Sequence, residues 1–553
     1  MGNPGRGGNP SYLRNRWDGS VLVLPKKYRN STFPPGVPAV ELAPMLARLH
    51  SVAFYGIEAV PTEVEVDVAR RGFAGTAVVG LPDAAVKESV ERVRSAIQNS
   101  GYEFPRYKTV INLAPADMRK EGPIFDLPIA LGILLANGEV ESDRTEAYVV
   151  AGELALDGRT RPIKGALSAA LLAKKQGFRG VILPSENGTE AGVVDGLDVI
   201  PVTCLTEAIG FLTGQLPLEP VTVDLEAVFA VAGQYDCDFG DVRGQEQAKR
   251  ALTIAAAGAH NVLLIGPPGS GKTMLAKRLP TVLPPLTLEE SLETTRIHSV
   301  SGELKLGTSL LATRPVRTPH HSASMPALVG GGTVPKAGEV SLAHHGVLFL
   351  DEFPEFTRHT LEALRQPMED AQVTIARTHA TVTFPASFML VAAMNPCPCG
   401  YFTDPRKPCK CSPPQIDKYL ARISGPLIDR IDIHVEVPAV PFSELRSERD
   451  GTPSSVVREQ VLAARQRQRA RFGDGATTLN GRMGSRQLRK FCKLDTAGEL
   501  ILRQAMTELG LSARAHDKVL RVARTIADLA GENSIRPEHV SEAVMYRRLD
   551  RQL

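Results

Sequence analysis

The sequence predicts an α/β protein with three folded parts, two α/β domains followed by a helical domain. Apolar strand-like runs alternate with amphipathic helical stretches over residues 45–217. The alternation returns between 235 and 440, and only helical periodicity remains over 455–553. At 553 residues, the chain is long enough for several domains that each bury a core.

Composition favours a cytoplasmic protein without a membrane segment. Hydrophobic residues make up 43% of the chain and charged residues 23%, which is typical of soluble globular proteins. No apolar stretch approaches the length that spans a bilayer, and the first residues lack the apolar core of a secretory signal. The seven cysteines fall mostly in one cluster, unlike the framework of a disulfide-rich secreted domain.

The first 44 residues are expected to form a disordered extension, because they are rich in Gly, Pro, Asn and Arg and show no apolar periodicity. Met45 lies at the boundary and is a second candidate for the initiating residue. The extension holds six Lys/Arg and two Asp/Glu, so it contributes +4 to a net charge of +3 and leaves −1 for the rest. Any nucleic-acid binding must therefore come from local patches. One candidate is 446–490, with eleven Lys/Arg against four Asp/Glu, although a solvated helix face explains it equally well.

The elements of the first domain follow from their own patterns. Strands are expected where β-branched and aliphatic residues run together, at 64–69, 77–81, 109–114, 148–152 and 180–184. Helices are expected where apolar residues recur at helical spacing, at 83–101, 126–138 and 165–177. The Pro-rich stretch 213–236 is expected to be a connector.

The second domain contains a phosphate-binding loop. In "NVLLIGPPGSGKTMLAKRL" (261–279), an apolar strand, a Gly-rich loop and a helix follow one another in the pattern G-x-x-x-x-G-K-[ST]. Backbone N–H groups of such a loop converge on phosphates, and the helix N-terminus adds a favourable dipole. Lys272 is expected to reach the β/γ-phosphates, and the Thr273 hydroxyl to bind Mg²⁺. The predicted ATP-binding residues are Gly266, Pro267, Pro268, Gly269, Ser270, Gly271, Lys272, Thr273 and Asp351.

Two further strands are expected to bring catalytic side chains to this loop. "GVLFLDE" (346–352) is an apolar strand that ends in two carboxylates. Asp351 at its tip is placed to hold Mg²⁺ together with Thr273, and Glu352 to orient and deprotonate the attacking water. "SFMLVAAMN" (387–395) ends at Asn395, whose amide is expected beside the γ-phosphate, in the sensor 1 position.

Two arginines complete the predicted catalytic set. Arg430 lies between a helix and a strand, from where it could reach the ATP of a neighbouring subunit. Arg514 opens a C-terminal helix and suits a sensor 2 role. A surface ion pair is an equally good interpretation of either residue when it is taken alone.

Several separate stretches, in this order, resemble the YifB/ComM family of Mg-chelatase-like AAA+ ATPases. The resemblance spans about residues 45–553, and its most specific stretches include "INLAPADMRKEGPIFDLPIALGIL", "RTPHHSAS", "GEVSLAHHGVLFLDEFPEF" and "AAMNPCPCG". The resemblance implies an AAA+ core with a C-terminal helical lid, and a hexameric ring in which Arg430 acts in trans. The ComM branch is associated with DNA branch migration in natural transformation.

The N-terminal domain is similar to the proteolytic domain of Lon, but its catalytic positions differ. Ile124 stands where Lon has its nucleophilic Ser, and Ala169 stands where Lon has its catalytic Lys. Lys164 and Ser168 are nearby but offset. Without a nucleophile or a base, we expect no proteolysis. The domain is expected to serve as a scaffold or as a docking surface for a protein partner.

Two features of the core fit a helicase-like ring. Residues 303–345 are a long insertion before the Asp351 strand, and 372–384 alternate like a hairpin with Arg377, Thr378 and His379 near its tip. In related rings such hairpins face the pore, where an Arg could meet a phosphate backbone. Five of the twelve histidines lie between 298 and 345. We expect a structural role for them, because adjacent histidines ligate one ion poorly.

Four cysteines follow the sensor asparagine directly. Cys397, Cys399, Cys409 and Cys411 form C-x-C-x₉-C-x-C in a loop over 397–411. Four thiolates can bind Zn²⁺ tetrahedrally, although the one-residue spacing is tighter than usual, and free thiols remain the alternative. We favour a structural zinc site, since four thiolates leave no open position for catalysis. The ComM branch lacks the full set, so the cluster favours the YifB branch.

The sequence thus predicts Mg²⁺-dependent ATP hydrolysis by a homo-oligomeric ring that remodels branched or single-stranded DNA. The alternative is a magnesium-chelatase-like subunit that drives metal insertion or remodels a protein. The extra Lon-like domain is evidence against the chelatase. No single motif in the chain specifies DNA.

Overall fold

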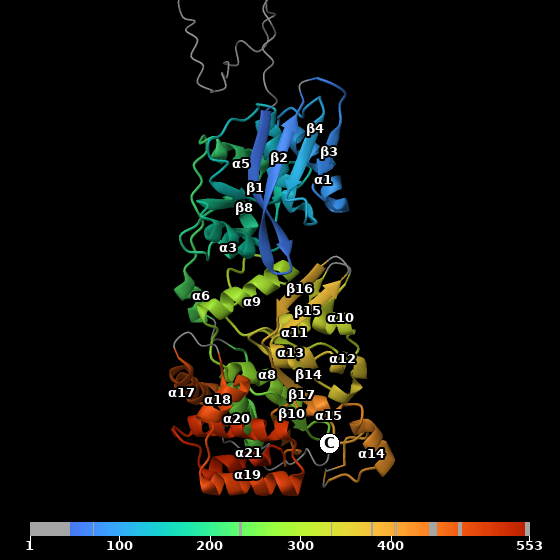
Figure 1. Cartoon of the computed structure of the whole chain (residues 1–553), viewed down its shortest axis with the longest axis vertical. Helices are drawn as coiled ribbons and strands as arrows, with labels where there is room; N and C mark the ends of the chain where they lie inside the picture. Colours follow the sequence, from blue (N-terminus) through green and yellow to red (C-terminus); the bar gives the residue numbers. More distant parts are fainter. Residues whose placement is uncertain are drawn as a thin grey trace, which may run out of the picture. The chain divides into compact units, whose positions relative to one another are not determined.

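The computed structural model describes residues 45–547, apart from Arg70, 232–234, 333–334, 378–379, 403, 405, 442–450 and 474–477 (Figure 1). The predicted disordered extension lies outside this part. The described residues form one compact unit, so the division into three domains remains a prediction. Within the described residues, no helix is long and apolar enough to cross a membrane.

The N-terminal part is built on a mixed seven-stranded sheet of order β3-β4-β2-β1-β5-β8-β9. β1 and β2 form an antiparallel hairpin, β4 pairs antiparallel with β2, and the other pairs are parallel. The strands are β1 Met45–Tyr55, β2 Glu58–Val68, β3 Thr76–Val79, β4 Thr109–Ala114, β5 Tyr148–Val150, β8 Gly180–Pro184 and β9 Asp198–Val202. A small hairpin, β6 Glu153–Leu154 with β7 Thr160–Arg161, lies outside this sheet.

Helices of this part pack on the sheet through apolar faces. α2 is apolar on nearly all sides because it is buried almost throughout. The helices are α1 Ala84–Asn99, α2 Asp126–Ala136, α3 Ala166–Gln176, α4 Gly188–Ala191 and α5 Leu205–Leu212. The five predicted strands and three predicted helices are confirmed. The strands β1, β6, β7 and β9 and the helices α4 and α5 are additional elements. The predicted connector contains a short helix, α6 Leu225–Val231, whose start is stabilised by the Asp224 carboxylate accepting from the Ala227 amide.

The second sheet is parallel throughout, with the order β11-β14-β17-β10-β18. Its strands are β10 Val262–Ile265, β11 Val316–Arg317, β14 Val347–Leu350, β17 Met389–Met394 and β18 Ile433–Glu436. β10, β14 and β17 are buried along their whole length, which explains their continuous apolar sequences. Because parallel strands end at the same edge, the residues after β10, β14 and β17 meet there.

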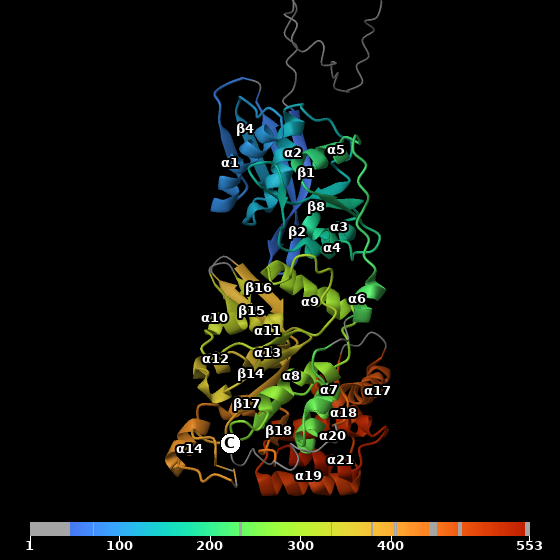
Figure 2. The same cartoon turned by 180° about the vertical axis from the view of Figure 1, so that it is seen from behind.

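Helices and short insertions surround this sheet (Figures 1 and 2). The helices are α7 Glu246–Gly258, α8 Lys272–Val282, α9 Leu288–Ser301, α10 Met325–Val329, α11 Glu339–Leu342, α12 Arg358–Glu362, α13 Arg365–Asp370, α14 Pro413–Leu420 and α15 Gly425–Ile428. The insertion before β14, which follows α9, holds β11, α10, α11 and a two-residue ladder, β12 Gly330–Gly331 with β13 Lys336–Ala337. β15 Gln372–Arg377 and β16 Ala380–Pro385 form the predicted hairpin.

The C-terminal part is helical, as predicted. Its helices are α17 Ser454–Phe472, α18 Ser485–Phe491, α19 Thr496–Leu509, α20 Ala513–Leu529 and α21 Pro537–Met545. α17 and α20 pack against α7, and Figure 2 shows α7 beside α17. One continuous hydrophobic core joins the sheet, α7 and α8 to these helices. The helical part is therefore bound to the sheet by shared apolar burial.

Candidate functional site

The phosphate-binding loop lies between β10 and α8, where the sequence places it. Gly269 and Gly271 adopt positive φ angles of 75° and 93°, a region that favours glycine. At Gly266, a Cβ would lie 2.1 Å from the carbonyl oxygen of Val437. The loop therefore requires glycine at all three positions, twice for its conformation and once for close packing.

Lys272 joins the loop to the sensor asparagine. Its Nζ donates to the carbonyl oxygens of Gly266 (2.7 Å) and Pro267 (2.9 Å) and to Oδ1 of Asn395 (3.2 Å). Burial lowers the pKa of Lys272, and the charge of Asp351 opposes this shift. Ser270 Oγ is buried without a partner among the described residues. A desolvated ammonium and an unpaired hydroxyl fit the phosphate chain of a nucleotide.

Thr273 and Asp351 form the predicted magnesium pair. Thr273 is the second residue of α8 and Asp351 follows β14, and the Thr273 hydroxyl donates to Oδ2 of Asp351 over 2.7 Å. The other oxygen, Oδ1, accepts from the Glu352 amide at 2.9 Å. Mg²⁺ prefers oxygen ligands and is often held by one carboxylate together with substrate phosphates. The donor set of this pair therefore fits Mg²⁺.

Glu352 occupies an unusual backbone conformation. Its φ is 51°, in the left-handed region that non-glycine residues seldom adopt and that is enriched at functional sites. Its side chain is 58% exposed, and Oε2 lies 3.0 Å from Nδ1 of His321. The sequence did not predict this contact. His321 lies in the family stretch "RTPHHSAS". The sequence of this stretch does not show that His321 would lie against Glu352.

Arg430 and Arg514 lie together. Arg430 is 9% exposed and forms an ion pair with Oε1 of Glu369 at 2.6 Å, and Arg514 lies 3.9 Å from the same oxygen. Both line a cavity of about 340 Å³. Among the described residues that line it, none belongs to the phosphate-binding loop, and Asp351, Glu352 and Asn395 are also absent. The predicted site residues thus form two groups, one around Lys272 and one around Glu369.

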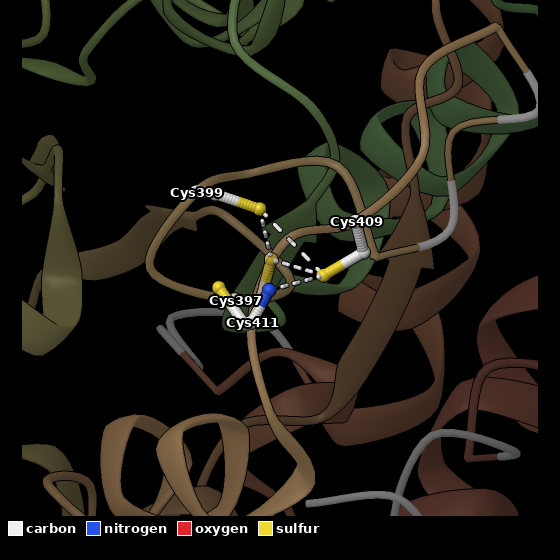
Figure 3. A group of neighbouring side chains, drawn as sticks. All are labelled: Cys397, Cys399, Cys409 and Cys411. Atoms are coloured by element: carbon white, nitrogen blue, oxygen red, sulfur yellow. Dashed lines mark hydrogen bonds between the residues drawn. The ribbon is translucent and has the colours of Figure 1, made fainter.

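The four cysteines converge on one point from two segments of the loop (Figure 3). The Sγ atom of Cys397 lies 3.4 Å from that of Cys399 and 3.7 Å from that of Cys409, and Cys399 and Cys409 are 3.6 Å apart. All four Sγ atoms, including that of Cys411, lie within 4.8 Å of one another. A tetrahedral zinc with Zn–S bonds of about 2.3 Å requires S–S separations of about 3.8 Å. The cluster could therefore hold a thiophilic metal ion.

The environment of the thiols is unequal. Hydrogen bonds from the backbone of Lys410 and Tyr401 lower the pKa of Cys399 to about 6. At Cys409, a backbone hydrogen bond from Cys411 opposes the shift, but burial and the thiols of Cys399 and Cys397 raise the pKa to about 12. A thiolate at one position thus disfavours a thiolate at the next. A bound cation removes this conflict, because it stabilises all four thiolates at once.

Comparison with known proteins identifies the family. Residues 64–187 match the model described as subunit ChlI of Mg-chelatase, 238–445 match magnesium chelatase, subunit ChlI, and 451–547 match its C-terminal region. The chain is 46% identical over 510 residues to the protein YifB of Salmonella typhimurium, covering 92% of this chain and 98% of that protein. It is also 46% identical over 512 residues to competence protein ComM of Haemophilus influenzae, with the same coverage. The chain belongs to the YifB/ComM family of Mg-chelatase-like ATPases.

Membership of the YifB/ComM family indicates ATPase-type activity with ATP and Mg²⁺, in agreement with the geometry around Lys272. Overall identity does not separate the two branches, since both relatives have the same value. Preference for the YifB branch therefore stays a prediction from the cysteines.

Part of this family member is similar to a Lon protease, and Ile124 and Ala169 are the residues predicted to replace the protease's dyad. Lon protease 2 of Bacillus subtilis is 30% identical over 141 residues, 25% of this chain and 25% of that protein. Ile124 is 5% exposed and Ala169 is fully buried, so both are core residues. The hydroxyl of Ser168 donates to the carbonyl of Ile57 at 2.9 Å. These contacts agree with a structural role for this part of the chain.

Two of the clustered histidines in this YifB/ComM family member, His344 and His345, make structural contacts. Nδ1 of His344 accepts from the Ser387 amide at 2.9 Å, so its proton is on Nε2, which lies 3.1 Å from Oε2 of Glu293. His345 Nε2 lies 3.0 Å from the same oxygen. Hydrogen bonds from His344 and His345 lower the pKa of Glu293. A protonated Nε2 donates a hydrogen bond and does not ligate a metal, which supports the structural interpretation.

Two predicted nucleic-acid surfaces of this family member are only partly described. The tip of the β15–β16 hairpin, Thr378 and His379, lies outside the described residues, and so does the Arg377 side chain. Behind the tip, the Tyr55 hydroxyl donates to the Thr381 carbonyl at 2.8 Å and accepts from the Thr381 amide at 2.9 Å. One side of the hairpin is therefore tied to the β1–β2 turn.

In the described part of the basic segment 446–490, three arginines make internal contacts. Arg458 donates to the carbonyl of Thr281 and Arg465 to that of Ala256, and Arg471 pairs with Asp528. Arg465 is 9% exposed. These three arginines join α17 to neighbouring segments. They therefore belong neither to a solvated helix face nor to a phosphate-binding surface.

Proposed function

We propose that the protein is a Mg²⁺-dependent ATPase that forms a homo-oligomeric ring and remodels DNA. The observation that carries the ATPase part is the convergence of Lys272, Thr273, Asp351 and Asn395 from the ends of three adjacent strands. In this proposal Lys272 binds the β/γ-phosphates, and Thr273 and Asp351 hold Mg²⁺. Glu352 deprotonates a water that Asn395 helps to align.

The separation of the arginines supports a ring. Arg430 and Arg514 share the Glu369 carboxylate and line a cavity that contains no residue of the phosphate-binding loop. In the proposed hexamer, both arginines act on the ATP of the neighbouring subunit, where they stabilise charge in the transition state. Glu369 balances their charge in a subunit whose neighbour carries no nucleotide.

Two observations support DNA as the substrate. A relative with 46% identity is named a competence protein, and this name favours a DNA-related substrate. The β15–β16 hairpin is present as expected for a pore-facing element. The rival function, metal insertion as in magnesium chelatase, is supported by the family models and by a match to the magnesium-chelatase 38 kDa subunit of Rhodobacter capsulatus. The Lon-like part would serve as a scaffold or a protein-docking surface under either function.

DNA-stimulated hydrolysis tests the proposal. Phosphate release by the full chain is measured alone, with forked DNA and with linear duplex, over a series of salt concentrations. Salt-sensitive stimulation by forked DNA that is lost in Lys272→Ala supports the motor. Hydrolysis that is indifferent to every DNA would falsify the DNA part and direct the search to a protein or tetrapyrrole partner. Sedimentation with and without ATP tests the ring.

We also propose that Cys397, Cys399, Cys409 and Cys411 hold one structural Zn²⁺. The support is the S–S separations of 3.4 to 3.7 Å among three of the four sulfurs. The metal content of protein purified under reducing conditions tests this part. With ATP and Mg²⁺, zinc completes the proposed set of cofactors.

A further inference from the structure

The four-cysteine loop lies against the phosphate-binding loop. Gly400, directly after Cys399, is buried and has a φ of 84°. A Cβ at this position would lie 2.6 Å from Cδ of Pro268 and 3.7 Å from Cγ of Asn395. The backbone of Gly400 therefore packs between the phosphate-binding loop and the sensor asparagine, at a distance that admits only glycine.

The proposed metal ligands flank these contacts. Asn395 stands two residues before Cys397, and the Gly400 amide donates to the Cys397 carbonyl at 3.0 Å. A metal bound to Cys397 and Cys399 would fix the turn between them. The same turn places Gly400 on Pro268 and holds the backbone that carries Asn395.

The rest of the loop has little else to keep it folded. Of its described residues between 401 and 411, only Asp404 is buried, and it pairs with its neighbour Arg406 at 3.0 Å. Phe402 is 54% exposed. A loop that buries so little apolar surface gains its order from another source, and metal binding supplies such free energy in small motifs.

We propose that the metal-loaded loop forms one wall of the nucleotide pocket, so that occupancy of the four-cysteine site controls nucleotide binding. The ligand is a thiophilic divalent cation, with Zn²⁺ as the expected ion. Without it, the Cys397–Gly400 turn loosens, and Pro268 and Asn395 lose the surface that positions them. Asn395, at the end of β17, then no longer accepts the hydrogen bond from Lys272. This inference rests on the zinc site and the nucleotide pocket of the proposed function.

Zinc content and nucleotide binding together test the proposal in the full chain. Three variants are compared with the wild type: Cys409→Ser with Cys411→Ser, which removes the two ligands farther along the chain from Asn395; Gly400→Ala; and the control Cys204→Ser. Zinc per chain is measured by elemental analysis, and the Kd of a fluorescent ATP analogue by anisotropy. Cys204 is a matched control because its Sγ contacts Thr206 at 3.0 Å, away from the cluster.

We expect one zinc per chain in the wild type, in the control and in Gly400→Ala, and none in the double variant. The Kd for nucleotide should rise about tenfold in the double variant and in Gly400→Ala, since supporting residues around a site are commonly worth that much. Chelation of the wild type should reproduce the change and added Zn²⁺ should reverse it. Reversal on the same protein keeps the test decisive even if the double variant does not fold.

Wild-type protein that binds no zinc after reconstitution under reducing conditions overturns the metal site. Loss of zinc without a change in Kd overturns the coupling. Because Kd is measured without turnover, failure of DNA-stimulated hydrolysis leaves the inference intact. If zinc-loaded protein binds no nucleotide, both the proposed ATPase and its dependence on the metal are wrong. The zinc content of this protein would still support the proposed metal site.

Discussion

Glu352→Gln should abolish hydrolysis without affecting folding or ATP binding. The side chain is 58% exposed, and its recorded contact is the 3.0 Å approach to His321, so an isosteric amide disturbs little packing. Substitutions at such positions usually change stability by less than about 0.5 kcal/mol. The Asp351 carboxylate, which accepts the Glu352 amide, is untouched, so Mg²⁺ binding should remain.

The expected loss follows from the role of the carboxylate. An amide cannot accept the proton of the attacking water, and a positioned general base contributes about 10²–10⁴ in rate. This corresponds to about 3–5 kcal/mol of transition-state stabilisation. Phosphate release measures the rate, and anisotropy of a fluorescent ATP analogue measures binding, each as a function of Mg²⁺.

Glu355→Gln is the matched control for this measurement. Glu355 lies in the same turn, is 44% exposed, and pairs with Arg422 at 2.7 Å. It should retain hydrolysis. A Glu352→Gln protein that keeps more than about a tenth of the wild-type rate is incompatible with a general base at this position. Equal losses in both variants would assign the effect to the turn as a whole.

Three further predictions concern an interface, a pH dependence and the helical part. Arg430→Ala should lower the rate of hydrolysis about a thousandfold while ATP binding is retained. Mixing this variant with Lys272→Ala should restore activity, because mixed rings contain some intact interfaces. If the mixture hydrolyses ATP no faster than the separate variants, Arg430 does not act in trans. Burial raises the pKa of Asp126 to about 6, so the folded protein retains a proton that the unfolded chain loses above its ordinary value of 3.8. Stability should therefore fall by up to about 3 kcal/mol as pH rises from about 4 to 6, and Asp126→Asn should flatten this part of a denaturation-against-pH curve. Asp528→Ala should lower the free energy of unfolding in urea by about 3–5 kcal/mol, because Asp528 is fully buried and its loss leaves the charge of Arg524 (2% exposed) without a carboxylate. A decrease below about 1 kcal/mol would contradict this prediction.

Local sequence predicted which side chains meet around Lys272, because each of them directly follows a buried strand; their roles at a nucleotide stay a prediction. A buried apolar strand followed by Gly266–Thr273, or by Asp351, determines both conformation and position at the sheet edge. The order of the strands then brings Asn395 to Lys272 without further information.

Contacts between side chains far apart in the chain were not predictable in this way. The pairing of Glu369 with Arg430 and Arg514, and the seat of Gly400 on Pro268, depend on packing between distant segments. The count of charges over 446–490 indicated an exposed basic segment, but it could not show that Arg465 is buried. The β1 strand was missed as a separate element, although its partner β2 was recognised by alternation.

The shared core of the sheet and the C-terminal helices has a practical consequence. The amide of His434, on edge strand β18, donates to the carbonyl of Tyr546 at 2.9 Å, so the last turn of the described chain covers an open side of the sheet. A chain that is cut after β18 would expose both this edge and the apolar face of α7. Any shortened version that is to keep the nucleotide pocket in soluble form must therefore extend at least to Tyr546, and trimming for crystallisation should begin from the other end.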